Sequence, residues 1–351
     1  MKQNSVGIKD IAKHAGVSTG PVDKVLNNRG GVSEATKKKI LKAIEELGYT
    51  PNILASRLKS AKTYNIAVLF PKGSDDNPFW YEHEKGFNDS MKELESFGFN
   101  IHLHLFHQNY EESFVSQTNM ILQKNYDGVF MVPVYKNETL RFTEYLEKKG
   151  VPVVLFDTQL SDLMRIPFIG QNAKDSGYLA ADLMNKCLPN EESILIASIT
   201  ERHDNYAHFD LREQGFKDFF KNSTSRLLEY KSIDQKDEVI KEQLSEFLKI
   251  HPNIKGVFVT NGIHKIAPLF SNIDNHILIG YDLIDKNIAY LKEGYIDFLI
   301  SQRPYTQAHS GIRLFYDLLI KKSPIKNTNN YLPIDIVMKS NIDYYTDFVE
   351  K

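Results

Sequence analysis

Residues 8–30 read IKDIAKHAGVSTGPVDKVLNNRG, and their spacing decides the architecture of the first part of the chain. The residues that recur at the spacing of one apolar helix face are Ile8, Ile11, Ala12 and Ala15. This helix is predicted to end at Gly16, and Ser18 is placed to cap a second helix that carries Pro21 in its first turn, where an amide proton is not needed. The pattern predicts a helix-turn-helix, whose second helix enters the major groove of DNA.

The charge of this region agrees with a nucleic-acid contact. A third helix is expected to begin after Ser33 and to end before Gly48. Residues 1–62 contain twelve Lys and Arg against five Asp and Glu, whereas the remainder contains 31 and 40. Neutralising phosphates releases counterions, so a small basic head on an acidic body is typical of a protein that binds DNA. The alternative is a solvated charged face.

Few long side chains are available on the second helix to contact base edges. Thr19 can meet a thymine methyl group or a phosphate, and Lys24 can donate to guanine O6 or N7. Asp23 would repel a nearby phosphate unless it accepts from cytosine N4 or pairs locally with Lys24 or Arg29. We expect Asp23 to act as a specificity filter, with local pairing as the alternative.

The stretches KDIAKHAGVST, VSEATKKKILKAIEELGY and PNILASRLKS resemble the DNA-binding headpiece of the lactose-repressor (LacI) family, over about residues 7–60. The resemblance implies a helix-turn-helix domain in residues 1–51 and a hinge helix and linker in residues 52–62. It also implies that Leu58 wedges between base pairs in the minor groove, where the unstacking cost is recovered through the bend. The implied DNA-contact set is Ser18, Thr19, Gly20, Pro21, Asp23, Lys24, Asn27, Arg29, Asn52, Leu58 and Lys59.

From Tyr64 onward, short apolar runs alternate with segments of helical period. The runs are IAVLF, IHLHLF, GVFMVP, VPVVLF, SILIAS, GVFVT and HILIGYD. This alternation predicts parallel α/β sheets with a ligand at the carboxyl ends of the strands. Neither GxGxxG nor GxxxxGK[ST] follows any run, so the sequence supports neither a dinucleotide site nor a P-loop, and no cofactor is expected.

Polar and aromatic side chains stand where these runs end. They are Asn77, Phe79, Trp80, Asp157, Asn261, Asp282 and Gln302. Carboxylates and amides satisfy hydroxyl groups, which both donate and accept, and an aromatic ring covers the C–H face of a sugar. A single residue of this kind is more often a helix cap or a packed side chain, but their joint placement predicts a site for a neutral polyhydroxyl ligand.

The body is similar to periplasmic ribose-binding proteins and to the effector domains of the same repressor family, through NPFW, LFD, REQGF, TNG, IGYD and ISQRP. The resemblance implies a type I periplasmic-binding-protein-like body in residues 63–351. Its N-subdomain would span about 63–160 and 303–330, and its C-subdomain about 161–302 and 331–345. The implied effector contacts are Asn77, Phe79, Trp80, Asp157, Arg212, Asn261, Asp282 and Gln302. Thr158 stands where the ribose proteins have arginine, which argues for a sugar other than ribose.

Several features exclude other classes of protein. Cys187 is the one cysteine, so no intrachain disulfide can form, and no run approaches the roughly 18 apolar residues of a membrane span. The start of the chain lacks a signal-peptide pattern, so we expect a cytoplasmic protein. His102, His104 and His107 could hold a metal, but no third ligand from elsewhere supports this, and we interpret them as a packed or solvated face.

Three functions were weighed against these features. The first is a transcriptional regulator, most simply a repressor, that binds operator DNA as a homodimer or higher oligomer and responds to a sugar-like effector. The second is a solute-binding protein for a transporter, which the missing signal peptide and the basic head disfavour. The third is a sugar-processing enzyme with Asp157 and Asp282 as acid and base. We expect the first, with no enzymatic activity, and effector binding could either release or recruit DNA.

Overall fold

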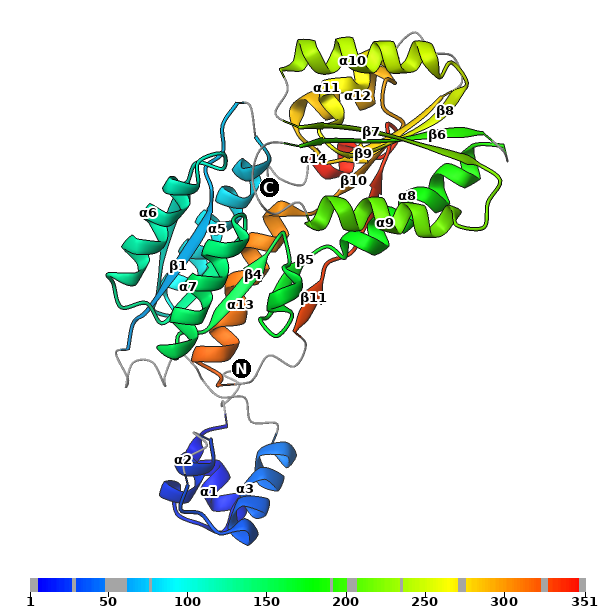
Figure 1. The fold of residues 1–351 in the computed structure, drawn as a ribbon. Coiled ribbons are helices and arrows are strands. Elements are labelled where there is room, and N and C mark those ends of the chain that lie inside the picture. The colour runs from blue at the N-terminus through cyan, green and yellow to red at the C-terminus, as the bar shows by residue number, and fades with distance from the viewer. Residues whose placement is uncertain are drawn as a thin grey trace. The chain divides into compact units, whose positions relative to one another are not determined.

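The computed structural model of the chain describes residues 6–26, 30–47, 62–75, 78–189, 192–200, 207–233, 236–270, 276–322 and 328–346. Its contacts divide the chain into two compact units, Met1–Lys62 and Thr63–Lys351. The first unit is helical, and the second contains two mixed layers of strands and helices (Figure 1). This is the all-α head and α/β body that the sequence predicted.

The first unit is a three-helix domain. Its helices are α1 (Ile8–Ala15), α2 (Thr19–Leu26) and α3 (Glu34–Glu46). Helix α1 ends as predicted at Gly16, which has a φ of 65° that favours glycine, and the Val17 amide closes the turn by donating to Ala12 O at 3.0 Å. The Ser33 side chain caps α3 by accepting from the Thr36 amide. The small core consists of Ile11, Ala12, Val22, Ile40 and Ala43.

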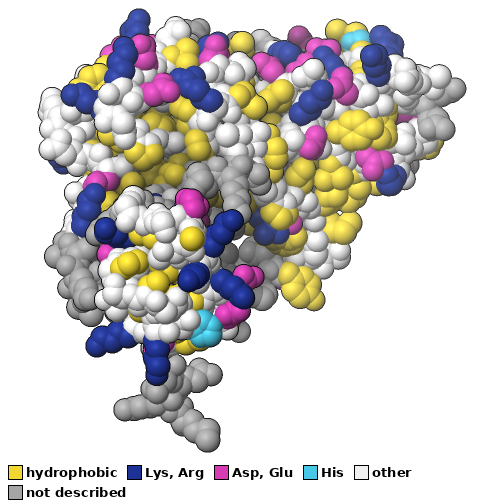
Figure 2. Space-filling view, turned by 90° about the horizontal axis from the view of Figure 1, so that it is seen from below, with side chains coloured by type: hydrophobic (Ala, Val, Ile, Leu, Met, Phe, Trp, Pro, Cys, Tyr) yellow, Lys and Arg dark blue, Asp and Glu magenta, His cyan; other side chains and the backbone are white. Residues whose placement is uncertain are grey.

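Basic side chains project from this unit. The exposed lysines among its described residues are Lys9, Lys13, Lys24, Lys37, Lys38, Lys39, Lys42 and Lys62. Figure 2 shows dark blue Lys side chains standing out from the surface of the head. The predicted hinge segment, residues 52–62, lies outside the described residues except for Lys62.

The first sheet of the second unit has six parallel strands in the order β11-β5-β4-β3-β1-β2. The strands are β1 (Tyr64–Pro71), β2 (Phe99–Phe106), β3 (Gly128–Met131), β4 (Val153–Phe156), β5 (Phe168–Gly170) and β11 (Asn329–Tyr331). The helices of this half are α5 (Phe79–Glu95), α6 (Glu111–Leu122), α7 (Lys136–Lys148), η1 (Ser161–Leu163) and α13 (Pro304–Leu319). Strands buried on both faces explain why their sequences read as continuous apolar runs.

The second sheet repeats this order as β12-β10-β9-β8-β6-β7, with only β12 antiparallel among its described strands. The strands are β6 (Ser193–Thr200), β7 (Arg226–Ile233), β8 (Ile254–Asn261), β9 (Ile277–Tyr281), β10 (Phe298–Ser301) and β12 (Asp335–Val337). The helices are α8 (Ala173–Cys187), α9 (Ala207–Phe220), α10 (Asp237–Ile250), α11 (Ile263–Ile266), η2 (Ala267–Phe270), α12 (Asp285–Glu293) and α14 (Asp343–Thr346). Helices α8 and α9 cover one face, and α10 to α12 cover the other (Figure 1).

The chain passes between the two halves three times: after β5, after β10 and between β11 and β12. The first half therefore continues to β5, beyond the expected boundary near residue 160, because Leu155 pairs with Phe168 in the same sheet. Two contacts join the crossing segments. Gln171 Nε2 donates to Ser301 O at 3.0 Å, and the Arg303 guanidinium binds both Asp335 oxygens at 2.5 and 2.8 Å.

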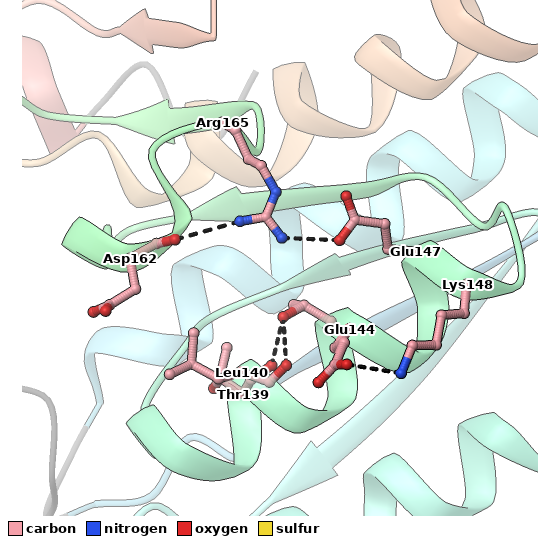
Figure 3. A network of polar contacts seen from close by, with 8 residues as sticks. Thr139, Leu140, Glu144, Glu147, Lys148, Asp162 and Arg165 are labelled. Carbon is pink, nitrogen blue, oxygen red and sulfur yellow. Dashed lines mark hydrogen bonds and ion pairs between the residues drawn. The ribbon is translucent and has the colours of Figure 1, made fainter.

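The loop that follows β4 is anchored on the outside of the first half. Arg165 donates to Glu147 on α7 at 2.8 Å and to Asp162 O at 3.5 Å, beside the Glu144–Lys148 pair of the same helix (Figure 3). The exposed Arg165–Glu147 pair contributes little free energy, but it connects this loop to α7. The loop begins with Asp157, a predicted ligand contact.

In the part of the chain that the structure describes, no helix combines the length and the apolarity that a bilayer crossing requires.

Candidate functional site

A cavity of about 120 Å³ lies at the carboxyl ends of strands from both sheets of the second unit. The predicted effector residues that line it are Phe79, Trp80, Asp157, Asn261, Asp282 and Gln302. They come from α5, β8 and the ends of β4, β9 and β10, which the sequence separates by more than two hundred residues. Parallel strands bring such positions to one edge, which is where ligands bind in open α/β sheets.

Asp157 and Asp282 occupy equivalent places in the two sheets, directly after β4 and β9. Their backbone amides bond to the neighbouring strand in the same way, at 3.2 Å to Ile169 O and 3.1 Å to Ile300 O. Both have positive φ angles, 63° and 77°, which are strained for a residue with a side chain. Such strain persists where the surrounding structure imposes it and clusters at ligand sites.

Burial dominates the electrostatics of this aspartate pair. Desolvation raises the pKa of Asp157 to about 6, against the opposing effects of the Thr158 hydrogen bond and the positive charge of Arg212. The pKa of Asp282 is also raised by desolvation, and Arg212 and the Gln302 hydrogen bond oppose the rise. Both carboxylates would gain from a ligand that donates hydrogen bonds to them, because each such bond favours the charged form.

Arg212 supports the cavity wall instead of lining the cavity. It lies on α9 with only 1% of its surface exposed, and its guanidinium stacks 3.7 Å from the centre of the Tyr281 ring. Nη1 donates to Thr260 O at 2.8 Å, while Nε is buried with no hydrogen-bond partner among the described residues. The sequence predicted a direct ligand contact here, whereas the observed position makes Arg212 a buried cation behind Tyr281.

The aromatic wall comes from the first turn of α5. The Phe79 and Trp80 rings lie 5.0 Å apart at a steep angle, and Trp80 Nε1 donates to Gln108 Oε1 at 2.9 Å. Beneath them, His83 is fully buried, and desolvation lowers its pKa to about 3, which keeps the ring neutral. The Trp80 indole therefore presents its ring to the cavity with its N–H already bonded.

The amide side chains hold the strand ends in place. Gln302 Nε2 donates to Asp282 Oδ1 at 2.6 Å, and Asn261 Nδ2 donates to Ile199 O at 2.8 Å. Asn287 donates to Tyr281 O and Asp282 O, and its own oxygen is buried without a hydrogen-bond partner among the described residues. Asn287 thus supports the backbone of the strand end that carries Asp282.

Sequence reasoning missed part of the lining. The additional residues include Gln108, Thr158, His208, Phe209, His264, Lys265, Tyr281 and Asn287. Tyr281 stands beside Asp282 in the IGYD stretch and could have been found there. His208 and Gln108 lie on α9 and after β2, where no periodic signal separates a cavity residue from an ordinary surface residue.

The candidate DNA contacts lie on or directly before α2. Ser18, Thr19, Gly20 and Lys24 are exposed, and Pro21 and Asp23 are half-buried. The other candidates, Asn27, Arg29, Asn52, Leu58 and Lys59, lie outside the described residues, as does Asn77 of the effector set.

The strand histidines make local contacts. His104 bonds to Tyr126 OH at 2.9 Å and to Gln117 Oε1 at 3.2 Å, while His102 packs against the Tyr126 ring and His107 against Tyr110. Across the described residues, no group of three or more His, Cys, Asp or Glu side chains is placed to hold a metal ion.

Family models match both units. The model of the periplasmic binding protein domain matches residues 66–323, and that of the bacterial regulatory proteins of the lacI family matches residues 7–52. The chain is 28% identical to the HTH-type transcriptional regulator RegA of Clostridium saccharobutylicum, over 91% of this chain and 94% of that protein. It is 26% identical to the sucrose operon repressor of Streptococcus mutans, over 95% and 99%.

A solved structure agrees with the fold of the second unit. The crystal structure of a proposed LacI transcriptional regulator from Bacteroides fragilis superposes with a TM-score of 0.73 at 29% identity, covering 81% of this chain and 100% of that chain.

Proposed function

Because the chain belongs to the lacI family of DNA-binding transcriptional regulators, which are not enzymes, and carries a periplasmic-binding-protein-like domain, we propose that a small neutral sugar bound in its cavity controls its affinity for operator DNA. The observation that carries the proposal is the pair of strained aspartates, Asp157 and Asp282, which face one cavity with an aromatic wall. A relative that matches over nearly its whole length is a sucrose operon repressor, which supports a sugar as the effector.

The charges around the cavity favour a neutral ligand. The buried carboxylate of Asp157 and the half-buried one of Asp282 stand near a buried cation, Arg212, whose charge lowers the pKa of both. The charge of the lining residue Lys265 is balanced by Asp237, because Lys265 Nζ lies 3.7 Å from Asp237 Oδ1. Desolvation lowers the pKa of His264 to about 4, which keeps that ring neutral. A sugar acid or sugar phosphate would add a negative charge next to the aspartates, and its desolvation would not be repaid.

The cavity couples to DNA binding through the equilibrium between open and closed states of the body. Residues from both halves line the cavity, so an effector makes its full set of contacts only when the halves are together. An effector shifts such an equilibrium by its difference in affinity for the two states. The head would then respond through the segment that joins it to the body, with a homodimer presenting two heads to a pseudo-palindromic operator.

A thermal-shift screen of monosaccharides, disaccharides, polyols and sugar acids tests the proposal. A ligand at 100 times its Kd adds about 2.7 kcal/mol to the free energy of unfolding. We expect neutral sugars to stabilise the protein and sugar acids to have no effect, and the bound sugar should be recovered unchanged.

Variants in the cavity connect binding with regulation. Asp282→Ala and Arg212→Ala should abolish the response to the sugar and leave operator binding intact, because each leaves buried partners unpaired in the body. Asp285→Ala is the matched control, since Asp285 is exposed three residues from Asp282 and outside the cavity lining. Calorimetry that finds undiminished sugar binding in both variants would mean that the site depends neither on Asp282 nor on the Arg212 charge behind Tyr281.

A further inference from the structure

Two side chains from opposite halves of the body meet across the cavity. Thr158 directly follows Asp157 at the end of β4 in the first half, and His208 is the second residue of α9 in the second half. Thr158 Oγ1 lies 3.2 Å from His208 Nδ1, and both side chains line the cavity. Neither residue belongs to one of the three crossing segments, so the contact is a further link between the halves, at the cavity itself.

The direction of the hydrogen bonds follows from the chemistry of a hydroxyl. Thr158 Oγ1 also lies 2.9 Å from Asp157 Oδ2, to which it donates. A hydroxyl has one proton, so with that proton on the carboxylate side its oxygen accepts from His208 Nδ1–H. A three-member chain, from His208 through Thr158 to Asp157, thus connects α9 to a carboxylate of the cavity.

We propose that Thr158 and His208 form a latch that holds the two halves of the body together around the cavity before an effector binds. The latch is a positioning pair: it orients Asp157 through the Thr158 hydroxyl and keeps the lining from both halves in contact. Thr158 is 4% exposed, which is the burial expected of a side chain enclosed between the halves.

The latch would raise the apparent affinity of the protein for its sugar effector, a consequence that rests on the proposed function. When the binding-competent state is only partly populated, apparent affinity falls in proportion to that population. A latch that forms without ligand raises the population of the closed state, so a small sugar with few contacts can still bind. One neutral hydrogen bond of this kind changes the ratio of closed to open protein by about 3- to 10-fold.

The chain provides a probe that needs no effector. Trp80 is the only tryptophan, it lines the cavity, and it is 4% exposed. Acrylamide quenching of its fluorescence in the ligand-free full chain therefore reports whether the cavity is open. Thr158→Val removes the hydroxyl at nearly constant shape, whereas Thr158→Ser keeps it. Likewise His208→Leu removes the donor, whereas His208→Asn places an amide N–H close to the position of Nδ1.

We expect stronger quenching in Thr158→Val and in His208→Leu, and quenching close to that of the unchanged protein in Thr158→Ser and His208→Asn. The double variant Thr158→Val/His208→Leu should be quenched no more than either single variant, because one contact is lost in all three. Circular dichroism and urea unfolding of each variant separate opening from loss of the fold.

Equal quenching in the valine and serine variants, with the fold intact, would overturn the latch. So would additive effects in the double variant, which would mean that each residue acts alone. A failure of every sugar to stabilise the unchanged protein would contradict the proposed function instead, and the quenching result would still decide the latch.

Discussion

Asp157, which we propose as an effector contact, lowers the stability of the body when its carboxyl group ionises. Its pKa is raised from an ordinary value of 3.8 to about 6 because the carboxyl group is buried. The folded protein therefore binds more protons than the unfolded chain between these pH values. The contribution of this group to stability is present below about pH 4 and is lost as the pH rises through about 6. The ionised Asp157 carboxylate that the proposed site needs at neutral pH therefore lowers the stability of the ligand-free body.

Asp157→Asn should remove this dependence. The free energy of unfolding of the variant, relative to the unchanged protein, should rise by about 2 kcal/mol between pH 4 and pH 7, since one pKa unit corresponds to about 1.4 kcal/mol. Urea unfolding of both proteins at several pH values measures this difference, in which the opposite effect of buried His83 cancels. If the difference in free energy of unfolding between the two proteins did not change from pH 4 to pH 7, ionisation of Asp157 would not lower the stability of the folded protein.

In the head, Asp23 is the residue whose charge is least expected beside DNA phosphates. It is half-buried on α2, between the exposed residues Gly20 and Lys24. If it filters DNA sequences, Asp23→Asn should raise affinity for non-specific DNA. It should also reduce the difference in binding free energy between the operator and an operator variant with one cytosine replaced, by about 1 to 3 kcal/mol. Titrations of both DNAs at one salt concentration, after the operator has been selected from a random library, measure the gap. Equal discrimination by both proteins would leave Asp23 with a local pairing role.

At the scale of elements, the cavity depends on the close packing of α8 against α9. A Cβ atom on Gly177 of α8 would lie 1.9 Å from Arg212 O, and one on Gly215 of α9 would lie 1.9 Å from Lys174 O. Glycine is needed at both positions because each helix backbone approaches the other. The same close packing places Arg212 behind Tyr281. The position of the positive charge near the two aspartates therefore depends on the packing of α8 against α9.

Gly177→Ala should therefore destabilise the body by about 2 kcal/mol or more, because the overpacked helices must separate. The same separation should weaken binding of any sugar found in the screen. Gly20→Ala is the matched control: Gly20 is also within a helix, but nothing lies within 4 Å of the added Cβ. Urea unfolding that shows equal stability for Gly177→Ala and the unchanged protein would contradict the packing argument.

At the scale of the whole molecule, the expected homodimer needs a surface on the body. We propose that two segments, residues 87–94 and 116–122, form this surface. In the first, Phe87, Ser90 and Leu94 are buried within the body, so only its polar positions are exposed. In the second, Met120 is 44% exposed beside a groove between α6 and α7. Met120 is therefore the residue whose substitution best tests the dimer.

We predict a dimer at micromolar concentration in sedimentation and protection of two half-sites on operator DNA. Met120→Lys should weaken association, because it places a charge in an apolar contact. Ile250→Lys is the control, since Ile250 is 73% exposed on α10, away from the proposed surface. A monomer that protects a single half-site would contradict the dimer, and equal association of both variants would place the interface elsewhere.

Features that depend on neighbouring residues could be predicted from the sequence. The periodicity of residues 8–15, the glycine at position 16 and the cap at Ser33 specify the head helices locally. Apolar runs alternating with helical segments specified two layers of parallel strands. Because parallel strands end at one edge, the positions of Asp157 and Asp282 after their strands also predicted where a ligand site would form.

Contacts between distant elements could not be predicted from the sequence. Strand β5 joins the first sheet by pairing with β4. A strand this short has no sequence pattern that indicates the sheet to which it belongs. Arg212 lies behind Tyr281 because the α8–α9 approach places its backbone there. The contact between Thr158 and His208 joins residues that are distant in the chain, and no local pattern encodes it. Such features arise from the packing of whole elements, where the energy of each contact depends on the position of both partners.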